Sequence, residues 1–146
     1  MAIGYTAYQY GGGSGNVIIG DSALSAISNC DNIIAIGEIG LDKLINIDFN
    51  LQKELLAKQI LLAEQLQKPI IIHCVKSQTD IIAIKKKLKP TVPMIIHGFN
   101  QNRQILDQLI NHQFYISFGA ALMNEKSNAF QLINFVPKAR LFFETD

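Results

Sequence analysis

The chain alternates between short runs of apolar, β-branched residues and longer amphipathic segments, and this alternation constrains its fold more than any other feature. The apolar runs predict buried strands over residues 32–37, 69–72, 93–96, 113–118 and 140–143. The segments between them predict helices over residues 49–67, 78–89, 102–112 and 126–135. Strands that are apolar throughout and are joined by helices indicate a parallel sheet covered by helices.

Two α/β architectures fit this alternation: an open doubly wound sheet and a (β/α) barrel. The 146 residues are enough for one domain with a substantial core, so we expect a single domain over 1–146. Residues 1–10 add a strand-like segment, which brings the expected number of strands to about six. The glycine-rich run at 11–15 resembles a flexible linker, so the segment 1–15 is atypical of a βα unit.

Composition and charge exclude several classes of protein. The net charge of +1 argues against nucleic-acid binding through bulk positive charge. No apolar run approaches the roughly 20 residues of a membrane span, and no signal peptide is visible. The two cysteines, Cys30 and Cys74, are too few for a disulfide framework. We therefore expect a cytoplasmic protein without a membrane partner.

Ionisable residues follow the predicted strands where those strands end. Glu38 follows the first, His73 the second, His97 the third, and Asp146 comes shortly after the last. Because parallel strands end at one shared rim, we expect these four side chains to converge there. Two imidazoles and two carboxylates form a ligand set for a divalent metal ion. A single histidine after an apolar strand is more often a hydrogen-bonded core residue, but the coincidence of all four favours a metal site.

Other polar residues allow two interpretations. Glu144 is either a partner of a metal ligand or a residue of a barrel interior. Asp42 and Lys43 either contact substrate or form a surface pair, and His112 fits a role at a helix end.

The helix over 78–89 carries a cluster of lysines, namely Lys85, Lys86, Lys87 and Lys89. Its other face is apolar, which favours a solvated helix surface over a nucleic-acid patch.

Five motifs in order carry a resemblance to a known family. The chain resembles the TatD family of metal-dependent deoxyribonucleases, within the amidohydrolase-like barrels. The motifs are GEIGLD at 37–42, IIHC at 71–74, IIHGF at 95–99, YISFG at 115–119 and FETD at 143–146.

The resemblance implies a TIM-type (β/α) barrel that binds divalent metal ions (Zn, Mn or Mg) and hydrolyses phosphodiesters from a DNA end. Glu38 would bridge two ions, and His73 and His97 would bind one of them. Asp146 would hold an ion and orient or deprotonate the attacking water, so Asp146 and Glu38 are the expected catalytic residues.

The chain departs from the family pattern at both ends. The family has a His-x-His pair on its first strand, whereas the histidines here are His73, His97 and His112, and Thr6 stands where the second strand usually has a histidine. The family continues beyond the position of Asp146. We therefore expect a truncated, rebuilt or degenerate member whose barrel is partial or open. Open strand edges invite pairing, which predicts a homodimer or a domain swap.

Three functions follow from these features. The first is metal-dependent hydrolysis of phosphodiesters in DNA, impaired by the missing ligands. The second is an inactive barrel fragment that acts as a scaffold or binds a single metal ion. The third is an amidohydrolase acting on C–N bonds; Glu38, in place of the carboxylated lysine of many such enzymes, argues against it.

Overall fold

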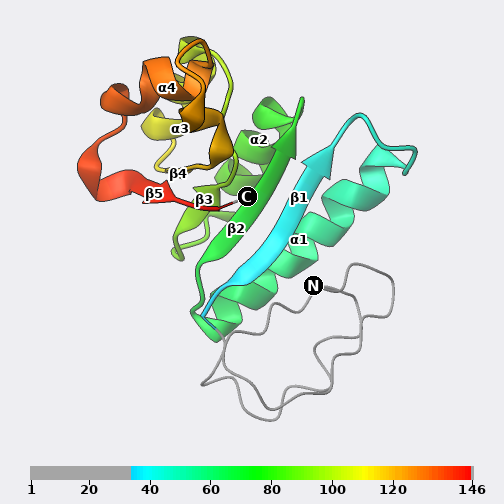
Figure 1. Cartoon of the computed structure of the whole chain (residues 1–146). Helices are drawn as coiled ribbons and strands as arrows, with labels where there is room; N and C mark the ends of the chain where they lie inside the picture. Colours follow the sequence, from blue (N-terminus) through cyan, green and yellow to red (C-terminus); the bar gives the residue numbers. More distant parts are fainter. Residues whose placement is uncertain (1–33, 146) are drawn as a thin grey trace.

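The structure, a computed structural model, describes residues 34–145 and forms one parallel sheet with helices (Figure 1). The strands are β1 (Ile36–Asp42), β2 (Ile70–Val75), β3 (Met94–Ile96), β4 (Tyr115–Phe118) and β5 (Leu141–Phe143). The α-helices are α1 (Phe49–Leu66), α2 (Gln78–Leu88), α3 (Arg103–Asn111) and α4 (Asn128–Leu132). Short 3-10 helices cover Ala120–Met123, Ile133–Phe135 and Lys138–Arg140.

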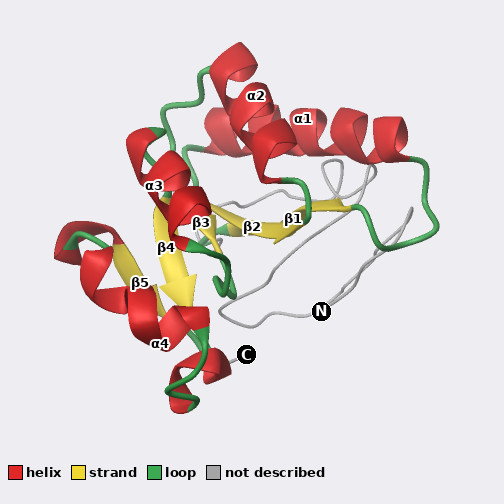
Figure 2. Cartoon of the chain, turned by 90° about the horizontal axis from the view of Figure 1, so that it is seen from above, coloured by secondary structure: helices red, strands yellow, loops and turns green. Residues whose placement is uncertain are grey.

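The order of the strands distinguishes between the two predicted architectures. The sheet runs β1-β2-β3-β4-β5, so each strand pairs in parallel with the next one along the chain. A doubly wound sheet reverses its strand order part-way, and no reversal occurs among these five strands. Right-handed crossovers in a consecutive order place every helix on the same face. Figure 2 shows α1, α2 and α3 along one side of the strands, as in the wall of a (β/α) barrel.

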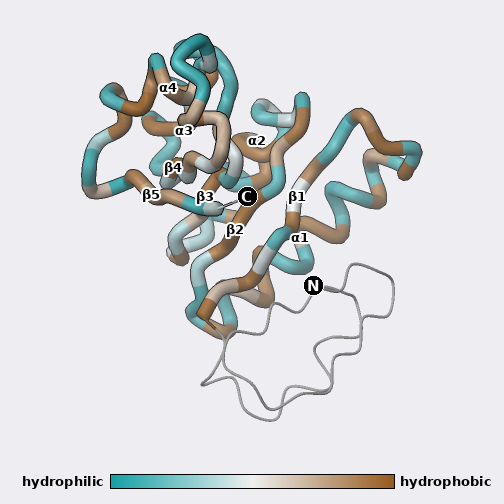
Figure 3. The backbone as a smooth tube through the Cα atoms, in the orientation of Figure 1, coloured by the Kyte–Doolittle hydropathy of each residue, from teal (hydrophilic) through white to brown (hydrophobic). Residues whose placement is uncertain are grey.

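The core lies between the sheet and these helices. Alternate residues of the strands, such as Ile70 and Ile72, are completely buried on the helix side. Leu56 and Ile60 of α1 supply the opposing layer. Figure 3 shows hydrophobic residues running along the central strands, while the helices alternate between hydrophobic and hydrophilic positions. Each fully buried side chain of this size contributes about 1.5–3 kcal/mol, so this layer supplies most of the stability.

The helices α1 and α3 each begin after a residue whose side chain accepts a free backbone N–H group. Asp48 accepts from the N–H of Leu51 at 2.8 Å, and Asn102 accepts from the N–H of Ile105 at 3.0 Å. The helix predicted over 126–135 is shorter than expected. α4 ends at Leu132 and continues as the 3-10 helix Ile133–Phe135, in a segment whose asparagine, phenylalanine and isoleucine residues are weak helix formers.

Two strands are longer than the sequence predicts. β1 was expected to end at residue 37 and β2 at residue 72, but the two remain paired as far as Asp42 and Val75. Glu38 and His73 therefore lie inside strands and not after them, which corrects their predicted positions. The strands tolerate these polar residues because alternate side chains point to opposite faces, and Glu38 and His73 face away from the helices. His97 and Glu144 directly follow β3 and β5, as predicted.

β1 approaches β2 so closely that two of its positions have no room for a side chain. A Cβ atom on Gly40 would lie 1.8 Å from the carbonyl oxygen of His73, and one on Gly37 would lie 2.6 Å from Cβ of Ile71. Any side chain at Gly40 would have to push the two backbones apart. The glycines of the GEIGLD motif are therefore required by strand packing.

Several predictions concern parts of the chain that the structure does not test. The strand-like segment 1–10, the linker-like run 11–15 and Asp146 lie outside residues 34–145. Within the described range β1 and β5 are the edge strands, and the predicted homodimer or domain swap stays a prediction, as does the cytoplasmic location. No helix among the described residues is long and apolar enough to cross a membrane.

We expect Gly40→Ala to lower the free energy of unfolding by about 2 kcal/mol or more, because its Cβ would overlap the backbone of β2. Glu125→Ala is the control, since Glu125 is exposed in a turn and alanine adds no atom there. Urea denaturation followed by circular dichroism measures both variants. Equal stabilities for the two would show that β1 and β2 can separate without cost.

Candidate metal centre

The sheet face opposite the helices carries the candidate site. Ile39 and Leu41 of β1 are buried on the helix side, so the residues that alternate with them, Glu38, Gly40 and Asp42, belong to the other face. On β2, Ile70 and Ile72 are buried in the same way and His73 alternates with them. The pleat thus places both carboxylates of β1 and the first imidazole on one surface.

An irregularity in β1 sets the position of Glu38. Ile36 pairs with Ile70 and Ile39 with Ile72, so three steps along β1 oppose two along β2. Such a bulge rotates the residues between its ends. It allows Ile36 and Ile39 both to be buried, at 3% exposure each, while Glu38 between them reaches the open face.

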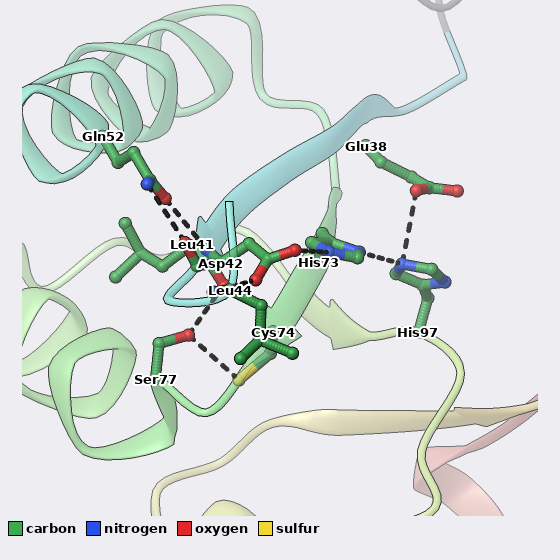
Figure 4. A network of polar contacts seen from close by, with 9 residues as sticks. All are labelled: Glu38, Leu41, Asp42, Leu44, Gln52, His73, Cys74, Ser77 and His97. Atoms are coloured by element: carbon green, nitrogen blue, oxygen red, sulfur yellow. Dashed lines mark hydrogen bonds and ion pairs between the residues drawn. The ribbon is translucent and has the colours of Figure 1, made fainter. Parts of the chain in front are cut away.

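Glu38, His73 and His97 come together in space from three neighbouring strands (Figure 4). One ligand atom from each lies within 4.8 Å of the other two. Nδ1 of His73 is 3.1 Å from Nε2 of His97, and Oε2 of Glu38 is 3.3 Å from the same Nε2. Three of the four predicted ligands are therefore neighbours. The fourth, Asp146, lies outside the described residues.

His97 is flanked by carboxylates on both sides of its ring. Glu38 faces Nε2, and Oε1 of Glu144 lies 3.7 Å from Nδ1. A neutral imidazole has only one N–H, so it can donate to only one of the two carboxylates. A cation bound to Nε2 of His97 would resolve this conflict, because the ring could then keep its single N–H on Nδ1, facing Glu144. Glu38 and Nδ1 of His73 also face Nε2 of His97.

His73 has the same arrangement with a different carboxylate. Oδ2 of Asp42 lies 3.5 Å from Nε2 of His73, on the side of the ring away from His97. A carboxylate next to one ring nitrogen of a histidine favours the proton there and leaves the other nitrogen free to bind a metal. Asp42 thus favours the tautomer of His73 in which Nδ1 is free.

Glu144 is held in place by the backbone next to His97. The N–H of Gly98 donates to Oε1 of Glu144 at 2.6 Å, and the N–H of Glu144 donates to the carbonyl of Phe118 at 3.0 Å. Gly98 has a φ of +58°, a conformation that favours glycine. Of the two interpretations of Glu144 left open by the sequence, the geometry supports a partner of a metal ligand.

Gln52 fixes the end of β1. The N–H of Asp42 donates to its Oε1 at 2.9 Å, and its Nε2 donates to the carbonyls of Asp42 and Ile47, both at 3.1 Å. Gln52 is buried in the first turns of α1. It therefore joins the helix to the strand at the residue that contacts His73.

Cys74 is next to His73 in the sequence but faces the other side of the sheet. Burial raises the pKa of the Cys74 thiol, against the opposing effect of a hydrogen bond with Ser77. A thiol with a raised pKa remains protonated and is a poor metal ligand. Cys74 is thus a free, half-buried thiol outside the site.

Two other residues named in the sequence analysis, His112 and Lys43, do not belong to the site. His112 is at the C-terminal end of α3, where its N–H donates to the carbonyl of Gln108 at 3.1 Å, as expected of a helix-end residue. Lys43 forms a surface pair with Asp80 at 2.7 Å, so only its neighbour Asp42 faces the site. The alternation that starts at Glu38 would have placed Asp42 on the same face, but the predicted strand ended too early for that inference.

Comparisons with known proteins identify the family of the chain. The family model described as TatD related DNase matches residues 17–146, which is most of the chain. The chain belongs to the TatD family. The family assignment made from the five motifs is thereby confirmed.

Individual relatives cover most of this chain but only part of their own length. An uncharacterized metal-dependent hydrolase, YabD of Bacillus subtilis, is 30% identical over 126 residues, covering 84% of this chain and 49% of the relative. The 3'-5' ssDNA/RNA exonuclease TatD of Salmonella typhimurium is 28% identical over 132 residues, covering 86% of this chain and 50% of the relative. The chain thus spans about half the length of these TatD relatives.

A solved structure supports the same fold. The TatD homologue YJJV of Escherichia coli superposes with a TM-score of 0.70 at 28% identity, covering 80% of this chain and 46% of that one. The predicted parallel α/β fold of the TIM-barrel type is therefore confirmed, with five of about six expected strands in the described range.

We expect Gln52→Leu to lower the free energy of unfolding by about 2–4 kcal/mol, because three backbone groups would lose their partner. Gln65→Leu is the matched control, since Gln65 is exposed on the same helix. Urea denaturation measures the difference. If both variants unfolded at the same urea concentration, Gln52 would not hold the end of β1.

Proposed function

We propose that this chain is a metal-dependent hydrolase of phosphodiesters whose ion is held by Glu38, His73 and His97, with Asp146 as a fourth ligand. The observation that carries the proposal is the convergence of three ligand atoms within 4.8 Å. Two histidines and one carboxylate, with a position left open for water or substrate, are a typical ligand set of catalytic zinc sites.

The separations of the ligand atoms fit a common ion. Ligand atoms about 2.1 Å from one ion lie roughly 3–4 Å from each other. The two distances at Nε2 of His97, 3.1 Å to His73 and 3.3 Å to Glu38, fall in this range. The three ligands therefore need only small side-chain movements to share one ion.

The proposed chemistry divides between the ion and the side chains. A bound divalent ion would lower the pKa of a water molecule and stabilise charge on the phosphate. Asp42 and Glu144 orient His73 and His97 by holding the proton on the ring nitrogen away from the site. Glu38 and Asp146 act on the reacting groups, and Asp146 orients or deprotonates the attacking water.

A DNA strand is the substrate that we propose. The Salmonella relative is named as an exonuclease of single-stranded DNA and RNA, and a relative in Schizosaccharomyces pombe is named as a deoxyribonuclease. The site is at the C-terminal rim of the sheet, the usual position of the active site in barrels of this type.

A second candidate function is the binding of a single ion without hydrolysis. The chain has three histidines, and the third, His112, caps α3 and takes no part in the cluster. The described residues thus bring together the ligands of one ion and no histidine for a second. A chain that binds one ion in this way would hold metal and leave DNA intact.

We expect His97→Ala to remove bound metal and to lower any hydrolysis of 3′-labelled single-stranded DNA in Mn²⁺ by about 100-fold or more. His112→Ala is the matched control and should keep both properties. Metal content is measured by mass spectrometry and cleavage by gel electrophoresis. Metal retained in His97→Ala would contradict the site, whereas metal without cleavage in the unaltered chain would support the second candidate.

We expect Asp42→Asn to weaken metal affinity about 10- to 100-fold, because the amide no longer favours the metal-binding tautomer of His73. Asp80→Asn removes the same charge at the same rim without contacting a histidine, and it should bind metal with unchanged affinity. Competition with a fluorescent chelator measures both constants. The role of Asp42 would be refuted by equal affinities in the two variants.

A further inference from the structure

A small cavity lies at the end of the sheet opposite the metal centre. It has a volume of about 270 Å³ and lies between the C-terminal ends of α2 and α3, against Pro90 and Gln113. Helices of this fold end where the following strand begins, and β3 and β4 begin a few residues later. The cavity is therefore at the N-terminal rim, remote from Glu38, His73 and His97.

Basic side chains line this cavity. Lys85, Lys86 and Lys89 come from the end of α2, and His112 comes from the end of α3. Arg140 lies next to them and donates from Nη1 to the carbonyl of Ile110 at 3.0 Å. Among residues 34–145, no carboxylate lies within ion-pair distance of these lysines or of Arg140.

Lys85 is held inside this group of charges. Its Nζ donates to the carbonyl of Gln113 at 2.9 Å and lies 4.1 Å from the centre of the Phe114 ring. Burial, with a smaller effect from the charge of Arg140, lowers the pKa of Lys85 to about 8. Burial thus disfavours the positive charge of Lys85, although the Gln113 carbonyl and the Phe114 ring favour it, and a nearby anion would offset the cost of burial.

A solvated helix surface explains only part of this arrangement. Lysines are favourable at the C-terminal end of a helix because they interact with its dipole. That effect accounts equally for Lys87, which is exposed and does not line the cavity. It does not account for Lys85, which is half-buried in the hollow between the ends of α2 and α3, with Lys86 and Lys89 beside it.

We propose that this basic cavity binds a phosphate-class anion, either free phosphate or the terminal phosphate of a nucleotide. Pockets for drug-sized ligands have volumes of roughly 300–1,000 Å³, so this cavity suits a small group. Lysine ammonium groups bind phosphate as point charges. The proposal is independent of the metal centre, because the two sites share no residue.

Phosphate binding is measured by isothermal titration of the whole chain in EDTA at constant ionic strength, so that no metal-bound phosphate contributes. We expect one phosphate per chain, and affinity about three- to tenfold weaker in Lys86→Gln and in Lys89→Gln. Both lysines are exposed, so neither change disturbs the core. Lys87→Gln is the matched control, with the same loss of charge on the same helix and affinity within twofold of the unaltered chain.

Two results would overturn the proposal. One is the absence of phosphate binding above that of a chloride reference, and the other is equal weakening by Lys86→Gln, Lys89→Gln and Lys87→Gln. Titration with AMP identifies the source of the anion. Tighter binding of AMP than of phosphate would indicate a nucleotide, and equal affinity would indicate free phosphate.

A second measurement follows Lys85 itself. NMR of ¹³C-labelled lysine reports its pKa, which phosphate should raise from about 8 because the ammonium form gains a nearby negative charge. The signal of Lys87 should titrate identically with and without phosphate. A Lys85 titration curve unaffected by saturating phosphate would place the anion elsewhere.

Discussion

The close pairing of β1 with β2 is the constraint on which the rest of the site depends. Gly40 has no side chain because its Cβ would lie 1.8 Å from the carbonyl of His73. The close approach of Gly40 to His73 fixes the register of β1 relative to β2, and this register sets the distance from Asp42 to His73. The bulge between Ile36 and Ile39 then brings Glu38 to the open face. A shift of one residue would move these carboxylates to the helix side, where the core is apolar.

The charges at this face favour the binding of a cation. Three carboxylates, those of Glu38, Asp42 and Glu144, surround two imidazoles, and all five side chains are between 13% and 39% exposed. Carboxylates gathered at a half-buried surface repel one another and lose part of their hydration, which costs several kcal/mol. Backbone N–H groups offset part of this cost, since Gly98 donates to Glu144 and Leu44 donates to Asp42. A divalent ion between Glu38 and the facing ring nitrogens would compensate the charge and would leave each ring N–H for an outer carboxylate.

Most of the fold could be predicted from the sequence, because the periodicity of apolar residues in strands and helices is a local property. The parallel sheet, three of the four helices and the convergence of Glu38 with His73 and His97 follow from apolar runs and from the shared rim of parallel strands. The sequence predicts the ends of β1 and β2 too early, because a polar residue within an apolar run suggests the end of a strand. Glu38 and His73 instead lie inside their strands and face the open side of the sheet. The roles of Asp42 and Glu144 were left open for a different reason. They depend on contacts across strands, and no pattern along the chain reveals a distance between Asp42 and His73.

The two rims of the sheet each carry a cluster of charges, of opposite sign, although the chain as a whole is nearly neutral at +1. The C-terminal rim gathers Glu38, Asp42 and Glu144, while the N-terminal rim gathers the lysines of α2 with Arg140. The net charge sums the charges of both rims and therefore reveals neither cluster. An acidic rim repels a phosphodiester unless a cation intervenes, so the hydrolysis proposed for that end would require metal. The basic rim attracts phosphate without any metal, so the two ends of one sheet would respond in opposite ways to the removal of divalent ions.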